Sequence, residues 1–116
     1  MSTSSNRHRS GFTLMEIMLV VGLIGTLAAM AVPAFARARA RSAGAACVNN
    51  LRQIESAKQR WALETKADSG ALPTDADLFG PALYLKQKPE CPAGGQYTIA
   101  AVNNPPACDQ TGHVLD

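Results

Sequence analysis

An apolar run from Ile17 to Ala36 places the strongest constraint on this chain, because it contains no charged residue. A helix rises about 1.5 Å per residue, so a run of this length can cross the roughly 30 Å hydrocarbon core of a bilayer. It is longer than the apolar segment of an ordinary secretory signal peptide, and only Ala34-Phe35-Ala36 faintly matches a signal-peptidase site. The run therefore predicts a membrane-spanning helix that stays on the mature chain.

The residues directly before the run combine a glycine with a single acid. Gly11 gives a protease close access to the backbone, because glycine has no side chain. Glu16 stands just inside the apolar segment, where a carboxylate is costly and needs a partner. Two interpretations of Glu16 stay open: it pairs with a positive charge on a neighbouring chain, or it remains in water near the membrane surface.

The stretch Gly11-Phe12-Thr13-Leu14-Met15-Glu16 resembles the type IV prepilin cleavage and methylation motif, and the resemblance extends over residues 7–36. It implies that a membrane-embedded prepilin peptidase cuts between Gly11 and Phe12 and methylates the new amine of Phe12. It also implies that this amine, on a neighbouring subunit, pairs with Glu16 and sets the axial register of a filament, because burying either charge alone is unfavourable.

Three residues that weaken helices in water interrupt the apolar run, namely Gly22, Gly25 and Pro33. Membranes and packed bundles tolerate such residues when neighbours satisfy the backbone. Gly25 and Ala29 also form a small-xxx-small pair, which allows close approach of another helix. Together with the cleavage motif, this composition predicts helix packing in a filament core, with local unwinding between Gly22 and Pro33.

The charge balance argues against nucleic acid as a direct partner. The formal net charge is +2, and removal of residues 1–11 takes away Arg7 and Arg9, which leaves zero. Basic residues flank both sides of the apolar run, so charge does not decide its orientation; the resemblance implies that the leader lies inside. Three arginines beyond the run are expected to reach lipid phosphates, and a second hypothesis gives them salt bridges between subunits after assembly: Arg37, Arg39 and Arg41.

Good helix formers continue to Lys66 without a strong stop, which predicts an amphipathic second half of the same helix over residues 37–66. Apolar side chains recur there at spacings of three and four, so they form one stripe that is expected to pack against the C-terminal part: Cys47, Leu51, Ile54, Ala57 and Trp61. The opposite face is expected to stay in water and carries Arg52, Glu55, Lys58 and Gln59.

Residues 67–116 contain signals for short elements only. Thr74 and Asp77 have the spacing of a capping box, which predicts a short helix and explains the nearby acids better than a cation site does. Residues 96–102 have the composition of a strand, and residues 112–115 can form a last short strand. These signals predict an antiparallel sheet of about two to four strands that lies across the apolar stripe.

The chain has three cysteines, so one thiol is left over from any single disulfide. Cys91 and Cys108 bracket the predicted first strand, and we expect them to form a disulfide with each other. Cys47 would then be a buried free thiol. The resemblance supports this pairing, since pilins commonly close a C-terminal loop with a disulfide. The rival is Cys47 paired with either of the other two, which would pin the sheet to the helix.

No catalytic motif is apparent. His113 has no nucleophile at a recognisable spacing, and Cys91 and Cys108 are too far apart for a CxxC redox motif. The sequence contains neither a glycine-rich phosphate loop nor paired metal ligands. We therefore expect no enzymatic activity, no cofactor and no metal site, and we expect His113 on the surface of the last strand.

The resulting expectation is an α+β, pilin-like fold in which a long N-terminal helix packs against a small antiparallel sheet. Four segments are expected: a leader (1–11), a transmembrane and filament-core helix (12–36), an amphipathic half-helix (37–66) and a disulfide-tied β-rich domain (67–116). The resemblance implies a structural subunit of a type IV pilus-like filament. The alternatives are a pseudopilin of a type II secretion system and a membrane-anchored binding module that never polymerises.

The resemblance also implies the partners and the location. The expected partners are a prepilin peptidase, other copies of the chain or related pilins, an inner-membrane assembly platform and membrane lipid. The precursor is expected in the inner membrane with its C-terminal domain outside the cytoplasm, and the mature subunit in a pilus or periplasmic pseudopilus. A major pseudopilin is expected to carry an acidic calcium loop near its C-terminus, where this chain has only Asp109 and Asp116.

Overall fold

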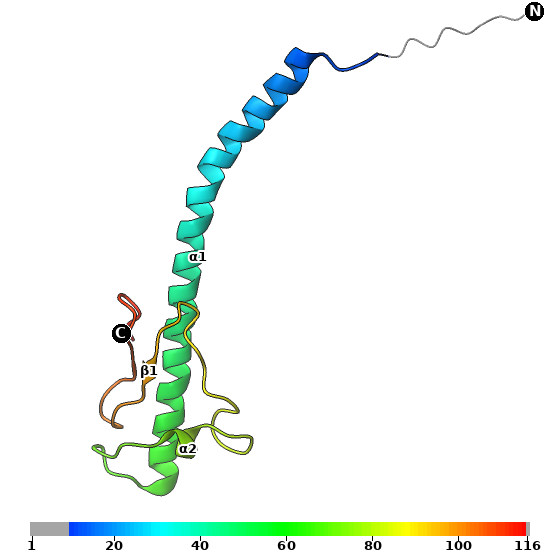
Figure 1. Cartoon of the computed structure of the whole chain (residues 1–116). Helices are drawn as coiled ribbons and strands as arrows, with labels where there is room; N and C mark the ends of the chain where they lie inside the picture. The colour runs from blue at the N-terminus through cyan, green and yellow to red at the C-terminus, as the bar shows by residue number, and fades with distance from the viewer. Residues whose placement is uncertain (1–9, 116) are drawn as a thin grey trace, which may run out of the picture. The chain divides into compact units, whose positions relative to one another are not determined.

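The computed structural model describes residues 10–115, so all of the predicted leader except Ser10 and Gly11 lies outside the described residues, as does Asp116. The elements follow in the order α1 (Leu14–Thr65), α2 (Asp75–Leu78), β1 (Tyr97–Thr98) and β2 (Ala107–Cys108) (Figure 1). The chain divides into two compact units between Ala36 and Arg37, and α1 contributes residues to both.

The first unit is the N-terminal half of α1, where the helix continues without a break through Gly22, Gly25 and Pro33. The local unwinding that the sequence predicts is therefore not present in the single chain. Every residue from Ser10 to Ala36 is exposed. The most apolar window of α1 has a mean hydropathy of 2.3 and is unburied, which is enough by length and composition to cross a membrane.

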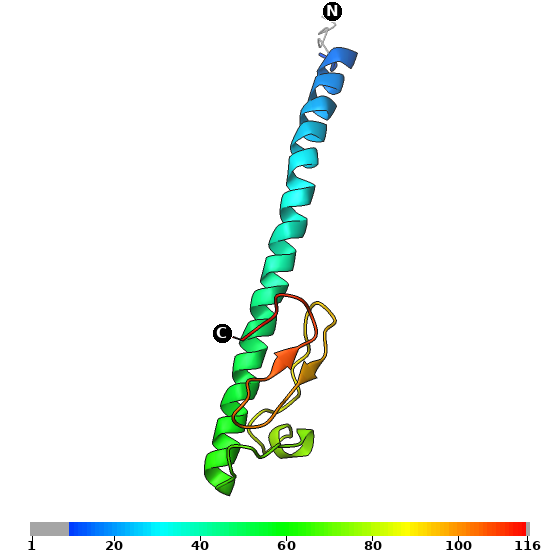
Figure 2. The same cartoon turned by 90° about the vertical axis from the view of Figure 1, so that its left-hand side faces the viewer.

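The second unit, residues 37–116, is the C-terminal unit, and in it residues 67–116 pack against the other half of α1. Figures 1 and 2 show α2 and the strands beside this part of the helix. The helix side of the core consists of Cys47, Leu51, Ile54 and Ala57, all buried. From the C-terminal part come Leu78, Cys91, Tyr97 and Ile99. This arrangement confirms the predicted fold class of a long helix with a small antiparallel sheet.

The sheet is smaller than its sequence signals indicate. β1 pairs antiparallel with β2, with Tyr97 opposite Cys108 and Thr98 opposite Ala107. The predicted strand over residues 96–102 keeps only two residues, because Ala100 adopts a φ of 59° and turns the backbone out of extended conformation. The predicted strand over residues 112–115 is wrong, since this segment has no ladder partner, and β2 takes its place.

Lys58 explains why β1 ends early. The expectation that this residue lies on the water-facing side of α1 is wrong, because its side chain is completely buried. Its ammonium group donates to the carbonyl oxygens of Ile99 (3.1 Å), Ala101 (3.0 Å) and Asn104. These carbonyls turn towards the helix instead of a neighbouring strand, so a helix cation replaces strand pairing in this loop.

The ends of the helices follow recognisable rules. Lys66 takes a φ of 52° directly after α1, and the amide of Ala67 donates to the carbonyl of Ala62 (3.0 Å), which terminates the helix. At the start of α2, the carboxylate of Asp77 accepts hydrogen bonds from the backbone amide (2.8 Å) and the hydroxyl (2.7 Å) of Thr74. The Thr74–Asp77 spacing thus produces the short helix that it predicts.

Candidate functional site

The residues of the cleavage-like motif lie at the beginning of α1. Thr13 directly precedes the helix, and its hydroxyl accepts a hydrogen bond from the amide of Glu16 (3.2 Å). In return, the carboxylate of Glu16 accepts one from the amide of Thr13 (3.3 Å). This reciprocal pair is a capping box, and it satisfies two amides that the first helical turn leaves without partners. This second role of Glu16 was not among the predictions from the sequence, although the Thr-x-x-Glu spacing encodes it.

The peptide bond between Gly11 and Phe12 precedes the helix and is open to a protease. Both residues are exposed and non-helical, and the side chain of Phe12 has 84% of its surface accessible. A new amine on Phe12 would be next to Thr13, whose own amide already binds the Glu16 carboxylate. The backbone therefore presents a cleavable bond and a fixed carboxylate at the same end of the helix.

The N-terminal half of α1 is apolar around its whole circumference, and no described part of the chain covers it. Large side chains such as Leu14, Met30 and Phe35 have more than two thirds of their surface exposed. A globular surface helix has one apolar stripe, whereas a helix that is apolar all round is buried in a membrane or among other helices. This half of α1 is therefore built to be covered by lipid or by neighbouring helices.

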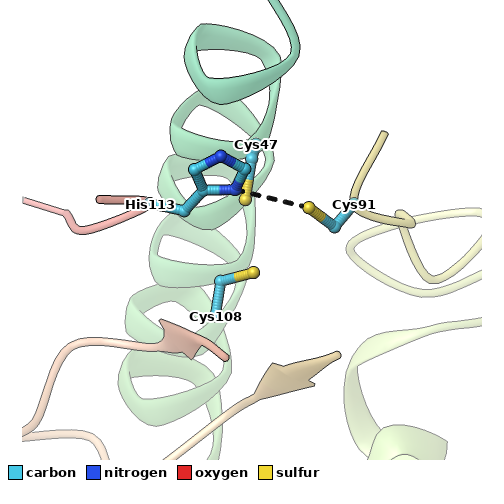
Figure 3. A group of neighbouring side chains, drawn as sticks. All are labelled: Cys47, Cys91, Cys108 and His113. Carbon is cyan, nitrogen blue, oxygen red and sulfur yellow. Dashed lines mark hydrogen bonds between the residues drawn. The ribbon is translucent and has the colours of Figure 1, made fainter. Parts of the chain in front are cut away.

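A second group of reactive side chains gathers in the C-terminal unit (Figure 3). Cys47 comes from α1, Cys91 from the loop before β1, Cys108 from β2 and His113 from the segment after β2. One potential ligand atom from each of the four lies within 4.8 Å of the other three. The Sγ atom of Cys91 is 3.5 Å from Nδ1 of His113. Cys47 and Cys91 are buried, while Cys108 and His113 are half-buried.

Hydrogen-bond donors lie beside two sulfur atoms of this cluster, those of Cys47 and Cys91. Cys47 is hydrogen-bonded to the hydroxyl of Tyr97. That hydroxyl in turn accepts a hydrogen bond from the side-chain amide nitrogen of Asn50 (3.1 Å). Burial raises the pKa of Cys47 to about 12. Burial also raises the pKa of Cys91, but the backbone amides of Ala93 and Gly95 donate to its sulfur, so that its pKa falls to about 6.

Two glycines bring main chain close to the cluster. A β-carbon at Gly95 would lie 2.7 Å from Sγ of Cys108, a distance too short for real contacts. A β-carbon at Gly44, on α1, would lie 3.4 Å from Nε2 of His113, so the imidazole ring packs directly on the helix backbone. His113 is therefore half-buried against the helix, and the expectation that it lies on a terminal strand is wrong because no strand forms at residues 112–115.

All three cysteines are free thiols in the structure, so neither the expected Cys91–Cys108 bond nor its rivals are formed. Cys47 lies beside both partners, so both alternatives raised by the sequence remain possible and the disulfide stays a prediction. The sequence did not reveal that His113 joins the thiols. The available signal was its distance of five residues from Cys108, which is within the usual spacing of paired metal ligands.

The other predicted packing residues lie on the face of α1 that packs against the C-terminal residues. Leu51 and Ile54 are completely buried, and Trp61 is half-buried against the core. Phe79, Tyr84 and Leu85 are likewise partly buried against the same core. The stripe thus positions residues 67–116 on the helix, with the thiol cluster at one end and Trp61 at the other.

A comparison with protein families matches residues 6–32 to the prokaryotic N-terminal methylation motif. Among curated proteins, the type IV major pilin protein PilA of Myxococcus xanthus is 41% identical over 56 residues, which cover 48% of this chain and 26% of that protein. The type II secretion system core protein G of Klebsiella michiganensis is 26% identical over 107 residues, covering 82% of this chain and 75% of that protein.

A further relative matches along most of the chain. The type IV major fimbrial protein FimA of Dichelobacter nodosus is 29% identical over 109 residues, covering 92% of this chain and 69% of that protein. The chain spans only 26% to 46% of the length of the pilin and fimbrial proteins that it matches at 38% to 41% identity. No solved structure matches the chain.

Proposed function

This chain belongs to the type IV pilin and pseudopilin family with an N-terminal methylation motif, and from that premise we propose that it is a structural subunit of a type IV pilus-like filament. The family is structural and non-enzymatic, in agreement with the absence of catalytic motifs from the sequence. The subunit polymerises through the N-terminal half of α1, which packs against the same half of neighbouring subunits.

The observation that carries this proposal is the exposed apolar half of α1. Its side chains are uncovered on every side, and Glu16 is its only acid. In the precursor, lipid covers this surface, because a helix of this hydropathy is stable across a bilayer. In the filament, neighbouring helices cover it, and the small pair Gly25 and Ala29 allows their close approach.

We further propose that a prepilin peptidase cleaves after Gly11 and methylates the amine of Phe12. The exposed, non-helical backbone at these two residues supports the cleavage step. Glu16 then pairs with the Phe12 amine of a neighbouring subunit, because a carboxylate in an apolar bundle needs a positive partner. The capping box supports this role, since it fixes Glu16 at the end of the helix where such an amine is created.

The remaining partners follow from the same assignment. The precursor is held in the inner membrane by the N-terminal half of α1, with its C-terminal unit outside the cytoplasm. An inner-membrane platform extracts it into the filament, and copies of the chain or related pilins form its neighbours. The four segments predicted from the sequence (1–11, 12–36, 37–66 and 67–116) remain the proposed organisation.

The second candidate is a pseudopilin of a type II secretion system. It is favoured by the extent of the match to core protein G, which covers 75% of that protein against 26% of PilA. The FimA match has comparable extent and points back to a pilus, so the pilus remains our first candidate. A membrane-anchored module that never polymerises is the third, and it predicts that Glu16 can be replaced without loss of function.

The experiment that tests the proposal is intact-mass analysis of sheared surface filaments and of the membrane fraction. We expect a filament species that begins at methylated Phe12. Gly11→Leu should block processing and leave the precursor in the membrane, whereas Ser10→Ala, one residue earlier, should be processed normally. Processed chain found only in the membrane fraction would favour the pseudopilin. An unprocessed chain that still begins at Met1 would reject the filament assignment.

A further inference from the structure

The cluster of Cys47, Cys91, Cys108 and His113 is not explained by filament assembly (Figure 3). Its members come from four separate places in the sequence, and the fold gathers them around one point. Three thiols and one imidazole nitrogen are the ligand types of structural zinc sites. We propose that these four residues bind one zinc ion, and that this ion ties residues 67–116 to α1.

The spacing of the ligand atoms fits tetrahedral coordination. With Zn–S distances of about 2.3 Å and Zn–N distances of about 2.0 Å, neighbouring ligand atoms in a tetrahedral site lie roughly 3.5–3.8 Å apart. The Cys91 sulfur and the Nδ1 atom of His113 are 3.5 Å apart, and all four ligand atoms lie within 4.8 Å of one another. Small side-chain rotations are therefore sufficient to bring all four atoms to one ion.

Hydrogen-bond donors lie beside two of the three sulfur atoms. Three thiolates and one zinc ion leave a net charge of −1, which a buried site must offset with hydrogen-bond donors. The backbone amides of Ala93 and Gly95 donate to Cys91, and the hydroxyl of Tyr97 bonds to Cys47. Asn50 orients that hydroxyl through a hydrogen bond of 3.1 Å. The donors to these two sulfur atoms therefore come from the turn after Cys91 and from β1.

A zinc ion also uses every member of the cluster, which a disulfide does not. Each of the three possible disulfides uses two cysteines and leaves the third sulfur beside the bond. None of them requires the imidazole of His113. His113 follows Cys108 by five positions, with four residues between them, which is within the spacing usual for ligand pairs. The close approach of Gly95 to Cys108 and of Gly44 to His113 leaves these two ligands little space to move away.

The fold of the C-terminal unit gives the ion a structural purpose. Its sheet consists of two strands of two residues each, and α2 is four residues long. Domains with so little regular structure and so small a core need additional cross-links to be stable. One ion at this position joins α1, the loop before β1, strand β2 and the segment that follows it.

The test is zinc binding by the full-length chain in detergent, purified from membranes without a reductant. We expect about one zinc ion per chain by elemental analysis, and all three thiols should resist alkylation until a chelator is added. Cobalt in place of zinc should give the visible spectrum of a tetrahedral thiolate site. Chelation should lower the melting temperature of the C-terminal unit, and added zinc should restore it.

Substitution of His113 separates zinc from a disulfide, because no disulfide requires the imidazole. His113→Ala should weaken zinc binding by more than about 100-fold, since changes outside the ligand set already cost 10–100-fold. Thr111→Ala, an exposed position in the same segment, is the matched control and should bind zinc as the unaltered chain does.

Two results would overturn the proposal. One is a disulfide between any two of the three cysteines, found by non-reducing peptide mapping of chain that contains no zinc. The other is a chain whose thiols are kept reduced by a phosphine and which still fails to retain added zinc or cobalt. If His113→Ala does not fold, the cobalt spectrum and thiol protection of the unaltered chain decide the question alone.

Discussion

The ammonium nitrogen of Lys58 lies 3.1 Å from the carbonyl oxygen of Ile99, which joins α1 to a loop 41 residues further along the chain. The carbonyls of Ala101 and Asn104 accept hydrogen bonds from its other two N–H groups. Glu55 is 3.1 Å away, but with these protons already used it stabilises the ammonium by charge rather than by a hydrogen bond. One fully buried cation thus organises the loop between β1 and β2.

Lys58→Met should destabilise the C-terminal unit strongly. Methionine fills a similar volume, but it leaves three carbonyl groups without donors and the Glu55 carboxylate without its partner. We expect a loss on the order of 3 kcal/mol, and therefore a fall in melting temperature of roughly 10–20 °C for a unit of this size. Thermal unfolding of the full chain in detergent measures this, with exposed Lys86→Met as the control. Equal melting temperatures for both variants would contradict the role of Lys58.

Gly95→Ala should destabilise the turn that meets β2. A β-carbon there would lie within 2.8 Å of atoms in three side chains: Cys108, Asp109 and Gln110. Such overpacking costs about 1–3 kcal/mol. Gly70→Ala is the control, because a β-carbon at Gly70 meets no atom within 4 Å. Chemical denaturation of both variants measures the difference, and a Gly95 variant as stable as the control would show that the turn can adjust.

Glu16→Gln should separate the two roles of Glu16. Glutamine can keep the capping box with Thr13, because the side-chain amide oxygen still accepts a hydrogen bond, but it removes the negative charge. We expect normal amounts of chain in the membrane and at least about a tenfold loss of surface filaments, because the Phe12 amine of a neighbour would be left without a counter-charge. Filament yield relative to Met15→Leu measures this. Normal yield with Gln would mean that helix capping is the only role of Glu16.

Asp77→Asn should remove a pH-dependent contribution to stability at the start of α2. Hydrogen bonds from the backbone amide and then the hydroxyl of Thr74 lower the pKa of Asp77. A carboxyl whose pKa is lowered by folding stabilises the protein above its unfolded pKa, and this stabilisation is lost as the pH falls through the folded pKa.

The melting temperature of Asp77→Asn should therefore be below that of the unaltered chain at neutral pH, and the difference should shrink as the solution is acidified. Asp68→Asn, in the preceding loop, controls for the loss of one surface carboxylate. A difference that is constant from neutral to acidic pH would show that the effect does not come from ionised Asp77.

Local signals were sufficient for the helices. The apolar run long enough to cross a membrane, the apolar stripe from Cys47 to Trp61 and the cap of α2 are local patterns. Each can be recognised from residues that are close in the sequence. The Thr13–Glu16 cap was encoded in the same way, although no capping role was predicted for Glu16 from the sequence. The fold class could be predicted for this reason, with the strand composition of residues 96–102 indicating the sheet.

Contacts between distant residues could not be derived in this way. Helical periodicity assigns Lys58 to the water-facing side, and its burial depends on where three carbonyls of a later loop come to lie. The same loop shortens β1 and moves its partner to β2. Cys47, Cys91, Cys108 and His113 are likewise spread over most of the C-terminal unit, and no spacing rule brings them to one point. Local hydrogen bonding and periodicity determined the elements, whereas the packing of a small core against one helix face decided which polar side chains are buried and which of them meet.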